Sequence, residues 1–491
     1  MKRSLWAVVA VAVAVGTGLA PAAAEAQQPD QGSPDSDIGV TASTIKIAVI
    51  ADVDNPARPG LFQGIVNGVQ AFAKYINGHG KLAGRNVEVD FIDSKLSADE
   101  ARNAVIKACQ EDFAIVGTSA LFLNNVQPMQ QCVDKVGQAT GLPDVPTLQT
   151  EVAHQCSPIS FAVIASAIDC ATKDQHPQTY TARMGQILYY KKQNKDLHGI
   201  WVLPSDLKST INSTTPVATG DEKAGVKADE DFFKISALAT QSDYTPVAQA
   251  IKQHNSTYGQ SISDYKSSVQ MRKEAKIQGV NSVKVWDCAL QCYDAKFLSE
   301  GGADVEGNYA SLFFVPFEEA KQNKSVDAFL KAIGGKSKAD GFSAQAWTAG
   351  LFFRDVVQNV VKANGNNGLT RARFLEEAAK IHDFRAEVGG QGMLGPTDVG
   401  GHKLNGCFVL TQVKSGKYVR IFPKEKGTLN CDSKNVTTSC TTSDAPVINR
   451  ISTRSMSAPS NGAITKIDRM RAIGAGTPRL TRNSQYTNAM N

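Results

Sequence analysis

Short apolar runs alternate with longer stretches of helical periodicity along the first part of the chain. The β-branched run Ile45–Ile50 has the length of a buried strand, and the apolar positions between Phe62 and Ile76 recur at helical spacing. Val87–Ile92 and Phe113–Val116 repeat the strand pattern, with a second helical stretch between them. This order of strand, helix and strand predicts a parallel sheet covered by helices on both faces.

Residues at the ends of the helical stretches support this assignment. Asn77-Gly78 ends the first helix, because glycine readily adopts the left-handed conformation that follows a helix end. Ser97 and Glu100 form a capping box that opens a helix through Cys109. A further helix is expected from Gln127 to Val136.

The alternation continues through a second block and predicts an α/β protein with two lobes. Strands are expected at 199–203, 232–235, 262–266, 282–286 and 309–315, and helices at 186–192, 244–254, 271–278, 346–360 and 371–380. A closing hairpin is expected from strands at 407–413 and 418–421. Because the late elements return to both blocks, we assign lobe 1 to 44–165 plus 317–385, and lobe 2 to 166–316 plus 386–431.

The predicted topology indicates where a ligand would bind. Parallel α/β sheets bind their ligands beyond the carboxyl ends of the strands. In the first block, that edge is formed by the loop after 45–50 and the loop after 113–116. These two loops are therefore the first candidates for a binding site.

The first 26 residues have the organisation of a signal peptide. Lys2 and Arg3 precede the apolar run Ala7–Ala20, and Ala24-Glu25-Ala26 supplies an A-x-A cleavage site. The apolar run is too short to span the roughly 30 Å of a bilayer core. We expect an exported chain that begins at Gln27 and resides in the periplasm, at the cell envelope or outside the cell.

Two polar segments without periodicity flank the predicted lobes. We interpret 27–43 and 432–491 as a flexible N-terminal linker and a flexible C-terminal tail. Residues 445–491 hold seven basic side chains against one acidic side chain, so the tail is basic. A solvated tail is the simpler interpretation, and binding of membrane or cell-wall anions is the alternative.

The chain has nine cysteines, which in an oxidising compartment form bridges with at least one left over. Proximity along the chain predicts the pairs Cys109–Cys132, Cys156–Cys170, Cys288–Cys292 and Cys407–Cys431, with Cys440 left over. A metal or redox site is the alternative. The three residues between Cys288 and Cys292 differ from the two of a thioredoxin-like motif, and no histidine stands at zinc spacing from a cysteine.

Charge and motifs exclude several function classes. The formal net charge of +5 belongs mostly to the tail, so the body is close to neutral and gives no footprint for nucleic acid. The sequence has no Walker loop, no GxSxG elbow and no HExxH motif. We therefore expect neither an enzyme nor a resident cofactor or metal.

Several motifs of the two blocks resemble one known family. The first predicted helix ends in Ile76-Asn77 and a glycine-rich turn, the second strand ends in Asp93, and the third strand ends in Gly117. Asp243–Val247 has the pattern Asp-aromatic-Thr at a helix start. Together these features resemble the type 1 periplasmic binding proteins, specifically the leucine/isoleucine/valine-binding-like substrate-binding components of ABC transporters.

The resemblance implies a fold and a function. The fold is two doubly wound parallel-sheet lobes joined by a three-crossover hinge. The expected function is capture of a small polar solute, such as an amino acid or an amide, by hinge closure, and its delivery by a monomer to the membrane subunits of an ABC permease. Two alternatives remain open, a ligand-sensing envelope receptor of the same fold and an envelope protein with a degenerate cleft.

The resemblance also implies binding residues in both lobes. In lobe 1, hydroxyls after the third strand and in the following loop would hold a carboxylate. In lobe 2, positions after the strands would face the cleft, with an acidic residue for a ligand amine. The candidates are Thr118, Ser119, Thr147 and Thr150 in lobe 1, and Ser205, Asp206, Ser267, Asp287 and Gln291 in lobe 2.

Three further residues are candidates for the cleft. Arg58 follows the first strand and is suited to a bidentate carboxylate clamp. Phe122 and Trp347 would supply an apolar wall. Each candidate also has a plain structural interpretation, since hydroxyls and carboxylates at strand ends often cap helices, and a tryptophan in an apolar helical stripe is usually core. Leu203 is followed by Pro-Ser-Asp-Leu where the family has Tyr-Gly, so a branched-chain ligand is not inferred.

Overall fold

A computed structural model of the chain describes residues 35–175, 178–204, 208–230 and 233–440. The signal peptide predicted at 1–26 and the tail from 441 lie outside the described residues. Within the described ranges, no helix is long and apolar enough to cross a membrane.

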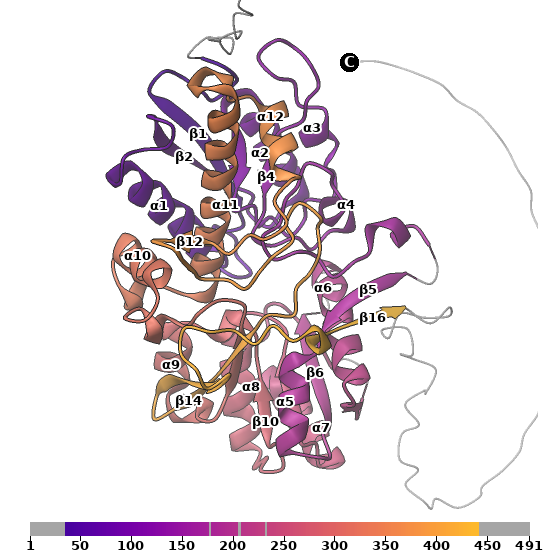
Figure 1. Cartoon of the computed structure of the whole chain (residues 1–491). Helices are drawn as coiled ribbons and strands as arrows, with labels where there is room; N and C mark the ends of the chain where they lie inside the picture. The colour runs from indigo at the N-terminus through magenta and orange to yellow at the C-terminus, as the bar shows by residue number, and fades with distance from the viewer. Residues whose placement is uncertain (1–34, 176–177, 205–207, 231–232, 441–491) are drawn as a thin grey trace, which may run out of the picture. The chain divides into compact units, whose positions relative to one another are not determined.

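The first lobe is built on a parallel sheet of strand order β2-β1-β3-β4 (Figure 1). Its strands are β1 Thr44–Ala51, β2 Asn86–Asp93, β3 Ala114–Val116 and β4 Asp144–Val145. The last five residues of β1 are all buried, as expected for a central parallel strand. The apolar runs of the sequence thus form the strands that they predict.

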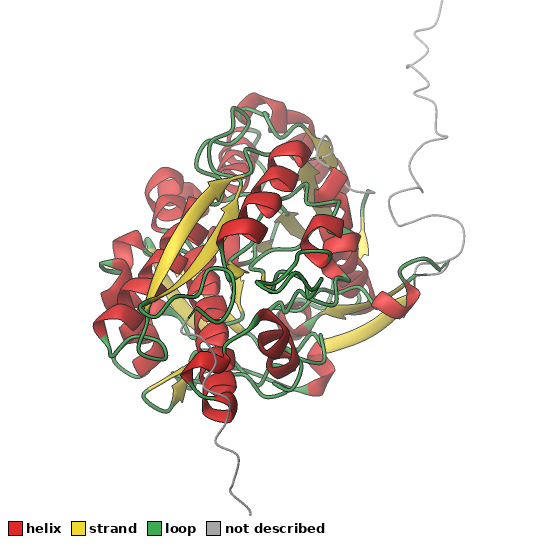
Figure 2. Ribbon diagram, turned by 90° about the horizontal axis from the view of Figure 1, so that it is seen from above, coloured by secondary structure: helices red, strands yellow, loops and turns green. Residues whose placement is uncertain are grey.

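Helices cover both faces of this sheet, as Figure 2 shows. The helices of this lobe are α1 Gln63–Gly78, α2 Ala98–Glu111, the short α3 Gln127–Gln130 and α4 Val152–Gln155, α10 Lys324–Ile333, α11 Gly341–Asn364 and α12 Arg371–Ala378. Helices α1 and α11 approach closely at glycines: a Cβ at Gly350 would meet Phe72 at 2.3 Å, and one at Gly68 would meet the Ser343 carbonyl at 2.3 Å. The predicted helix ends are present only in part. Ser97 caps α2 by accepting from the Glu100 N–H, but the Ser97 N–H donates to the Ser94 carbonyl, so the capping box is incomplete. Helix α1 runs through Gly78 and ends at His79, so a left-handed glycine at position 78 does not end it.

The second lobe has its own parallel sheet, in which β10, β9, β6 and β7 follow one another and β8 also pairs with β6. Its strands are β6 His198–Pro204, β7 Lys227–Ala228, β8 Phe233–Ile235, β9 Tyr258–Ser261 and β10 Val285–Asp287. Its helices are α5 Gly185–Gln193, α6 Lys208–Lys223, α7 Thr245–His254, α8 Tyr265–Ile277 and α9 Ala295–Gly301. An antiparallel sheet of β11 Tyr309–Leu312, β14 Val409–Lys414 and β15 Lys417–Phe422 completes the lobe and contains the predicted hairpin.

Some elements differ from the prediction. The strand expected at 262–266 is wrong, because the strand is β9 and the chain enters α8 at Tyr265, where the Asp264 side chain accepts from the Ser267 N–H. The helix expected from Gln127 to Val136 ends at Gln130, before the turn that carries Cys132. The pattern gives no sign of α6, since its sequence is rich in Ser and Thr and contains Pro216.

The segments next to the two lobes are more ordered than the polar composition predicts. In the supposed linker, the buried Asp37 carboxylate accepts from the backbone N–H groups of Arg371 and Lys135 at 2.7 and 3.1 Å. In the supposed tail, β16 Val436–Cys440 pairs with β5 Thr179–Arg183. Flexibility is therefore wrong for 35–43 and 432–440, because backbone and carboxylate hydrogen bonds, rather than an apolar pattern, hold them.

The chain crosses between the lobes three times, and the last crossover comes later than expected. Residues 386–404, assigned above to lobe 2, pack against lobe 1: the Ser325 hydroxyl donates to the Ala386 carbonyl at 2.8 Å, and His402 stacks on Phe161. The short hairpin of β12 Glu387–Val388 and β13 Gln391–Gly392 lies in this segment. The contacts place the third crossover after 404.

Disulfides join eight of the cysteines in the described ranges. The pairs are Cys109–Cys132, Cys156–Cys170, Cys288–Cys292 and Cys407–Cys431, the same pairs that proximity along the chain predicts.

Candidate ligand cleft between the lobes

Loops from the carboxyl ends of strands in both lobes enclose a cavity of about 370 Å³. Arg58 and Leu61 come from the loop after β1, and Leu148 from the loop after β4. Ile262 and Leu290 come from the loops after β9 and β10. Both parallel sheets thus direct their carboxyl ends to one site, as the topology predicts.

Apolar side chains dominate the lining, so we call this space the apolar cavity. Its large apolar residues are Leu61, Phe62, Leu96, Leu121, Leu148, Ile164, Val217, Ile262, Leu290, Phe313, Phe342 and Leu404. Its charged residues, among those described, are Arg58, Arg183 and Asp264. A site of this composition suits a ligand with an apolar body and few polar groups.

A second cavity of about 590 Å³ shares part of this lining. It is rich in charge, with Lys74, Asp294 and Asp340 among its residues, and we call it the charged cavity. Arg58 and Asp264 line both cavities and form an ion pair between the lobes, with Nε and Oδ2 3.0 Å apart.

The wall of the apolar cavity in lobe 1 is fixed by a buried carboxylate. Asp52, just past β1, accepts from the Ser94 hydroxyl and from the backbone N–H groups of Leu96 and Leu121, at 2.7 to 2.8 Å. Burial raises the pKa of Asp52, and these donors oppose the rise. Leu96 and Leu121 therefore present their side chains to the cavity from loops held by one group.

Two of the predicted lobe 1 residues lie beneath the cavity. Thr118 and Ser119 are fully buried and are not among the described residues that line either cavity. The Thr118 hydroxyl donates to Asp144, which also accepts from the Ser160 hydroxyl and His154 Nε2, both at 2.7 Å. The Thr118 hydroxyl serves this buried network, and the Ser119 hydroxyl donates to the Gly117 carbonyl at 3.0 Å. Neither lines a cavity here, so ligand contact by these two residues stays a prediction.

The other lobe 1 threonines do line the apolar cavity. The Thr150 hydroxyl donates to the Leu121 carbonyl at 2.9 Å. The Thr147 hydroxyl is buried and has no hydrogen-bond partner among the described residues, although the Thr147 carbonyl accepts from Gln345 Nε2 at 2.6 Å. Thr147 therefore offers a polar group to a ligand.

The aromatic residues predicted as an apolar wall do not form it. Phe122 is partly buried and outside both described linings. Trp347 is fully buried in α11, where its ring packs near Phe72, Tyr75 and Phe329. The apolar stripe of α11 faces the core of lobe 1, so Trp347 is a core residue.

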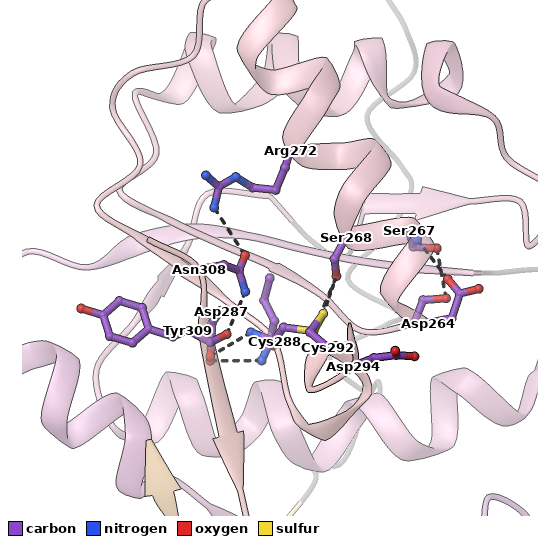
Figure 3. Close-up of a disulfide and its surroundings, with 12 residues drawn as sticks. Asp264, Ser267, Ser268, Arg272, Asp287, Cys288, Cys292, Asp294, Asn308 and Tyr309 are labelled. Carbon is purple, nitrogen blue, oxygen red and sulfur yellow. Dashed lines mark hydrogen bonds between the residues drawn. A yellow bond between two sulfur atoms is a disulfide. The ribbon is translucent and has the colours of Figure 1, made fainter. Parts of the chain in front are cut away.

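In lobe 2, Asp287 lies at the end of β10, beside the disulfide between Cys288 and Cys292 (Figure 3). It is the centre of a buried hydrogen-bonded cluster. It accepts from the hydroxyls of Tyr190 and Tyr258 at 2.8 and 3.1 Å, from Gln260 Nε2 at 3.3 Å, and from the Cys288 N–H at 2.9 Å. Burial raises the pKa of Asp287 to about 7. With its oxygens occupied and no place in either described lining, Asp287 does not meet a ligand amine here.

The structure places the remaining binding residues predicted for lobe 2 in three kinds of position. Gln291 lines both cavities. Ser267 is buried at the start of α8, where its N–H donates to Asp264 at 3.0 Å, so it is part of a helix cap. Ser205 and Asp206 lie outside the described residues and stay predictions.

Several polar residues of the apolar cavity were missed, and Gln260 and Arg183 are two of them. Gln260 lies on β9, and its Oε1 is buried without a partner among the described residues. Arg183 ends β5, a strand for which no element was predicted. The alternation Thr179-Tyr-Thr-Ala-Arg183 is the signal that would have found it.

A cavity bounded by strand ends of two parallel-sheet lobes defines a two-lobed binding protein. The family of periplasmic binding proteins matches residues 44–417, and this protein belongs to that family, which has a solute-binding role. None of the curated proteins gives a significant match.

Solved structures of ABC-transporter substrate-binding proteins share the fold. One from Aeropyrum pernix has 12% identity and a TM-score of 0.62, covering 80% of this chain and 97% of that one. A branched-chain amino acid transporter protein from Thermus thermophilus with bound valine has 10% identity and a TM-score of 0.61, covering 80% and 98%. A fatty acid transporter protein from Thermomonospora curvata has 14% identity and a TM-score of 0.59, covering 80% and 97%.

Proposed function

We propose that this protein captures a small organic solute in the apolar cavity by closing its two lobes, and delivers it to an ABC-type permease in the membrane. The observation that carries the proposal is the lining of the cavity, which comes from strand ends of both lobes. A solute that contacts both lobes stabilises the closed arrangement over an open one, and this difference drives hinge closure.

The ion pair between Arg58 and Asp264 supports this mechanism. It joins the loop after β1 to the start of α8, beside the cavity, and both side chains are largely shielded from solvent. A pair in this position forms only when the lobes approach one another. It therefore adds to the contacts that a bound solute would make.

The relatives support transport in general and leave the solute open. One of the similar proteins belongs to a fatty acid transporter, and another has bound valine. One fold thus accommodates solutes of different chemistry, and the side chains of this cavity decide which class enters.

Binding is tested by a thermal-shift screen of the mature chain against amino acids, amides and carboxylic acids. A ligand at one hundred times its Kd adds about 2.7 kcal/mol to the free energy of unfolding, which is a shift of a few degrees. Leu148→Trp, which fills the cavity, is expected to abolish the shift. Leu238→Trp is the matched control, because Leu238 is 62% exposed and outside the cavity. Equal shifts in both variants would contradict the site.

Delivery needs a separate measurement. Proteoliposomes containing the candidate permease are expected to take up the labelled solute only when the binding protein is added. Binding without stimulated uptake would contradict the transport role and favour a sensing receptor.

A further inference from the structure

We propose that the solute is a carboxylic acid with an apolar body and no ammonium group, and that Arg183 binds its carboxylate. This inference rests on the proposed function and names the class of solute. It follows from how the three charged residues of the apolar cavity are occupied.

The Arg183 guanidinium has N–H groups that no hydrogen bond within the described residues occupies. Its Nε donates to the Asn405 carbonyl at 3.0 Å, and its guanidinium lies 3.9 Å over the ring of Phe313. Its two Nη atoms have no hydrogen-bond partner, and no carboxylate pairs with it, within the ranges that the structure describes. Both Arg183 and Phe313 line the apolar cavity. A fork of free N–H groups on a cation matches the geometry of a carboxylate.

The surroundings hold this guanidinium in place while leaving its charge uncompensated. Arg183 is paired through its backbone with Val436 of β16, and its side chain is bounded by Phe313. Burial lowers the pKa of Arg183 to about 9, so the group stays protonated at neutral pH but lacks part of its hydration. An anion in the cavity would restore that stabilisation.

The cavity offers no matching site for an ammonium. Asp264 is its one carboxylate among the described lining residues, and it is paired with Arg58 while also capping α8. Asp144 and Asp287 are buried beneath the lining, with their oxygens occupied. An amino acid would have to bury its ammonium with no anionic partner, which is strongly unfavourable.

Two neutral groups of the lining are buried without a hydrogen-bond partner among the described residues. The Thr147 hydroxyl is a free donor that suits a carboxylate oxygen. Gln260 Oε1 is a free acceptor, since its amide nitrogen donates to Asp287. A neutral oxygen does not supply the countercharge that a buried ammonium needs, so Gln260 does not change the class of solute.

The experiment compares matched solutes by calorimetry on the mature chain. Isocaproate, leucine and isocaproamide share one apolar body, as do hydrocinnamate, phenylalanine and hydrocinnamamide. We expect at least one of the two acids to bind, and its amino acid and amide counterparts to bind at least about thirty-fold more weakly. The loss of a buried charge pair commonly has this size or more.

Variants identify the arginine responsible. Arg183→Gln is expected to weaken binding of the acid by at least about thirty-fold, and Arg183→Lys to recover part of it. Arg272→Gln is the matched control. Arg272 also lies over an aromatic ring, that of Trp286 at 4.8 Å, and donates to a backbone carbonyl, but it is outside both cavities. The Arg272→Gln variant should bind the acid with the affinity of the wild-type protein.

The outcomes separate this inference from the proposed function. Tighter binding of the amino acids or amides, or an Arg183→Gln variant with wild-type affinity, would overturn the assignment of the solute class. The absence of binding by both acids would overturn it as well. The proposed function falls only if the wider screen also finds no solute.

Discussion

Arg371 and Arg183 both lack a carboxylate partner at ion-pair distance among the described residues, and they differ in how many acceptors surround them. Arg371, at the start of α12, is fully buried, and all three of its side-chain nitrogens donate. Among its acceptors are the carbonyls of Phe113, Val133 and Cys109, at 3.2, 2.7 and 2.8 Å. Arg183 uses one nitrogen on one carbonyl. The number of occupied donors, rather than burial alone, distinguishes a structural arginine from one available to a ligand.

The largest effect on the free energy of unfolding is expected from removing the hydrogen-bond donors of Arg371. Arg371→Met leaves several buried carbonyls unpaired, so the free energy of unfolding should fall by at least about 3 kcal/mol in urea denaturation. Arg183→Met should change it by less than about 1 kcal/mol. A similar loss in both variants would break the distinction between the two arginines.

A smaller effect is expected beside Arg371, at Asp112. The Asp112 carbonyl accepts from Arg371, but both of its carboxylate oxygens are buried without a hydrogen-bond partner in the described part of the chain, and Lys46 Nζ is 3.7 Å away. Burial raises the pKa of Asp112 to about 7. The folded protein therefore holds a proton between about pH 4 and pH 7 that the unfolded chain releases.

The free energy of unfolding should accordingly rise as pH falls through that window. Above the window, the full cost of burying the ionised Asp112 carboxylate should be present. Asp112→Asn removes the charge, so it should raise the free energy of unfolding by about 1 kcal/mol or more near pH 8 and flatten its pH dependence. The exposed Asp54→Asn is the control. An Asp112→Asn variant with the pH dependence of the wild type would show that this carboxylate is not the titrating group.

The smallest effect concerns a third arginine, Arg58, whose acceptor Asp264 belongs to the other lobe. We expect Arg58→Gln to weaken solute binding by less than about tenfold, because the cost of removing both charges from water offsets much of their attraction, and Asp264 keeps its hydrogen bond from the Ser267 N–H. A double-mutant cycle with Asp264→Asn, which keeps a helix-capping side chain, isolates the pair. Additive losses would show that the pair does not assist closure.

The sequence identifies the fold because the fold depends on local pattern. The run at β1 and the helical stripe of α1 are dictated by burial on both faces of a parallel sheet, and the strand ends then locate the cleft. Arg58 and Gln291 were predicted from strand ends, and Thr147 and Thr150 from the family resemblance. All four line the apolar cavity, and their contact with a ligand stays a prediction.

The remainder of the site depends on contacts that a single sequence does not display. Thr118 and Asp287 have the residue types and positions expected of ligand contacts, yet other buried groups occupy them. Arg183 lies on a strand whose partner is about 250 residues away in a segment without apolar periodicity. Composition describes such a segment as flexible, because strand pairing by backbone hydrogen bonds leaves little trace in side-chain pattern.

The pairing of β16 with β5 has a consequence for the order in which the protein matures. Both parallel sheets can assemble from residues before 432, but the strand that carries Arg183 gains its neighbour only when Val436–Cys440 has been synthesised and translocated. Such a distant contact forms late in folding, since the entropy of closing the intervening chain is lost before the contact stabilises anything. A newly exported molecule would thus form both parallel sheets before Arg183 gained its neighbouring strand, and a cut near 432 would separate that neighbour from the rest of the chain.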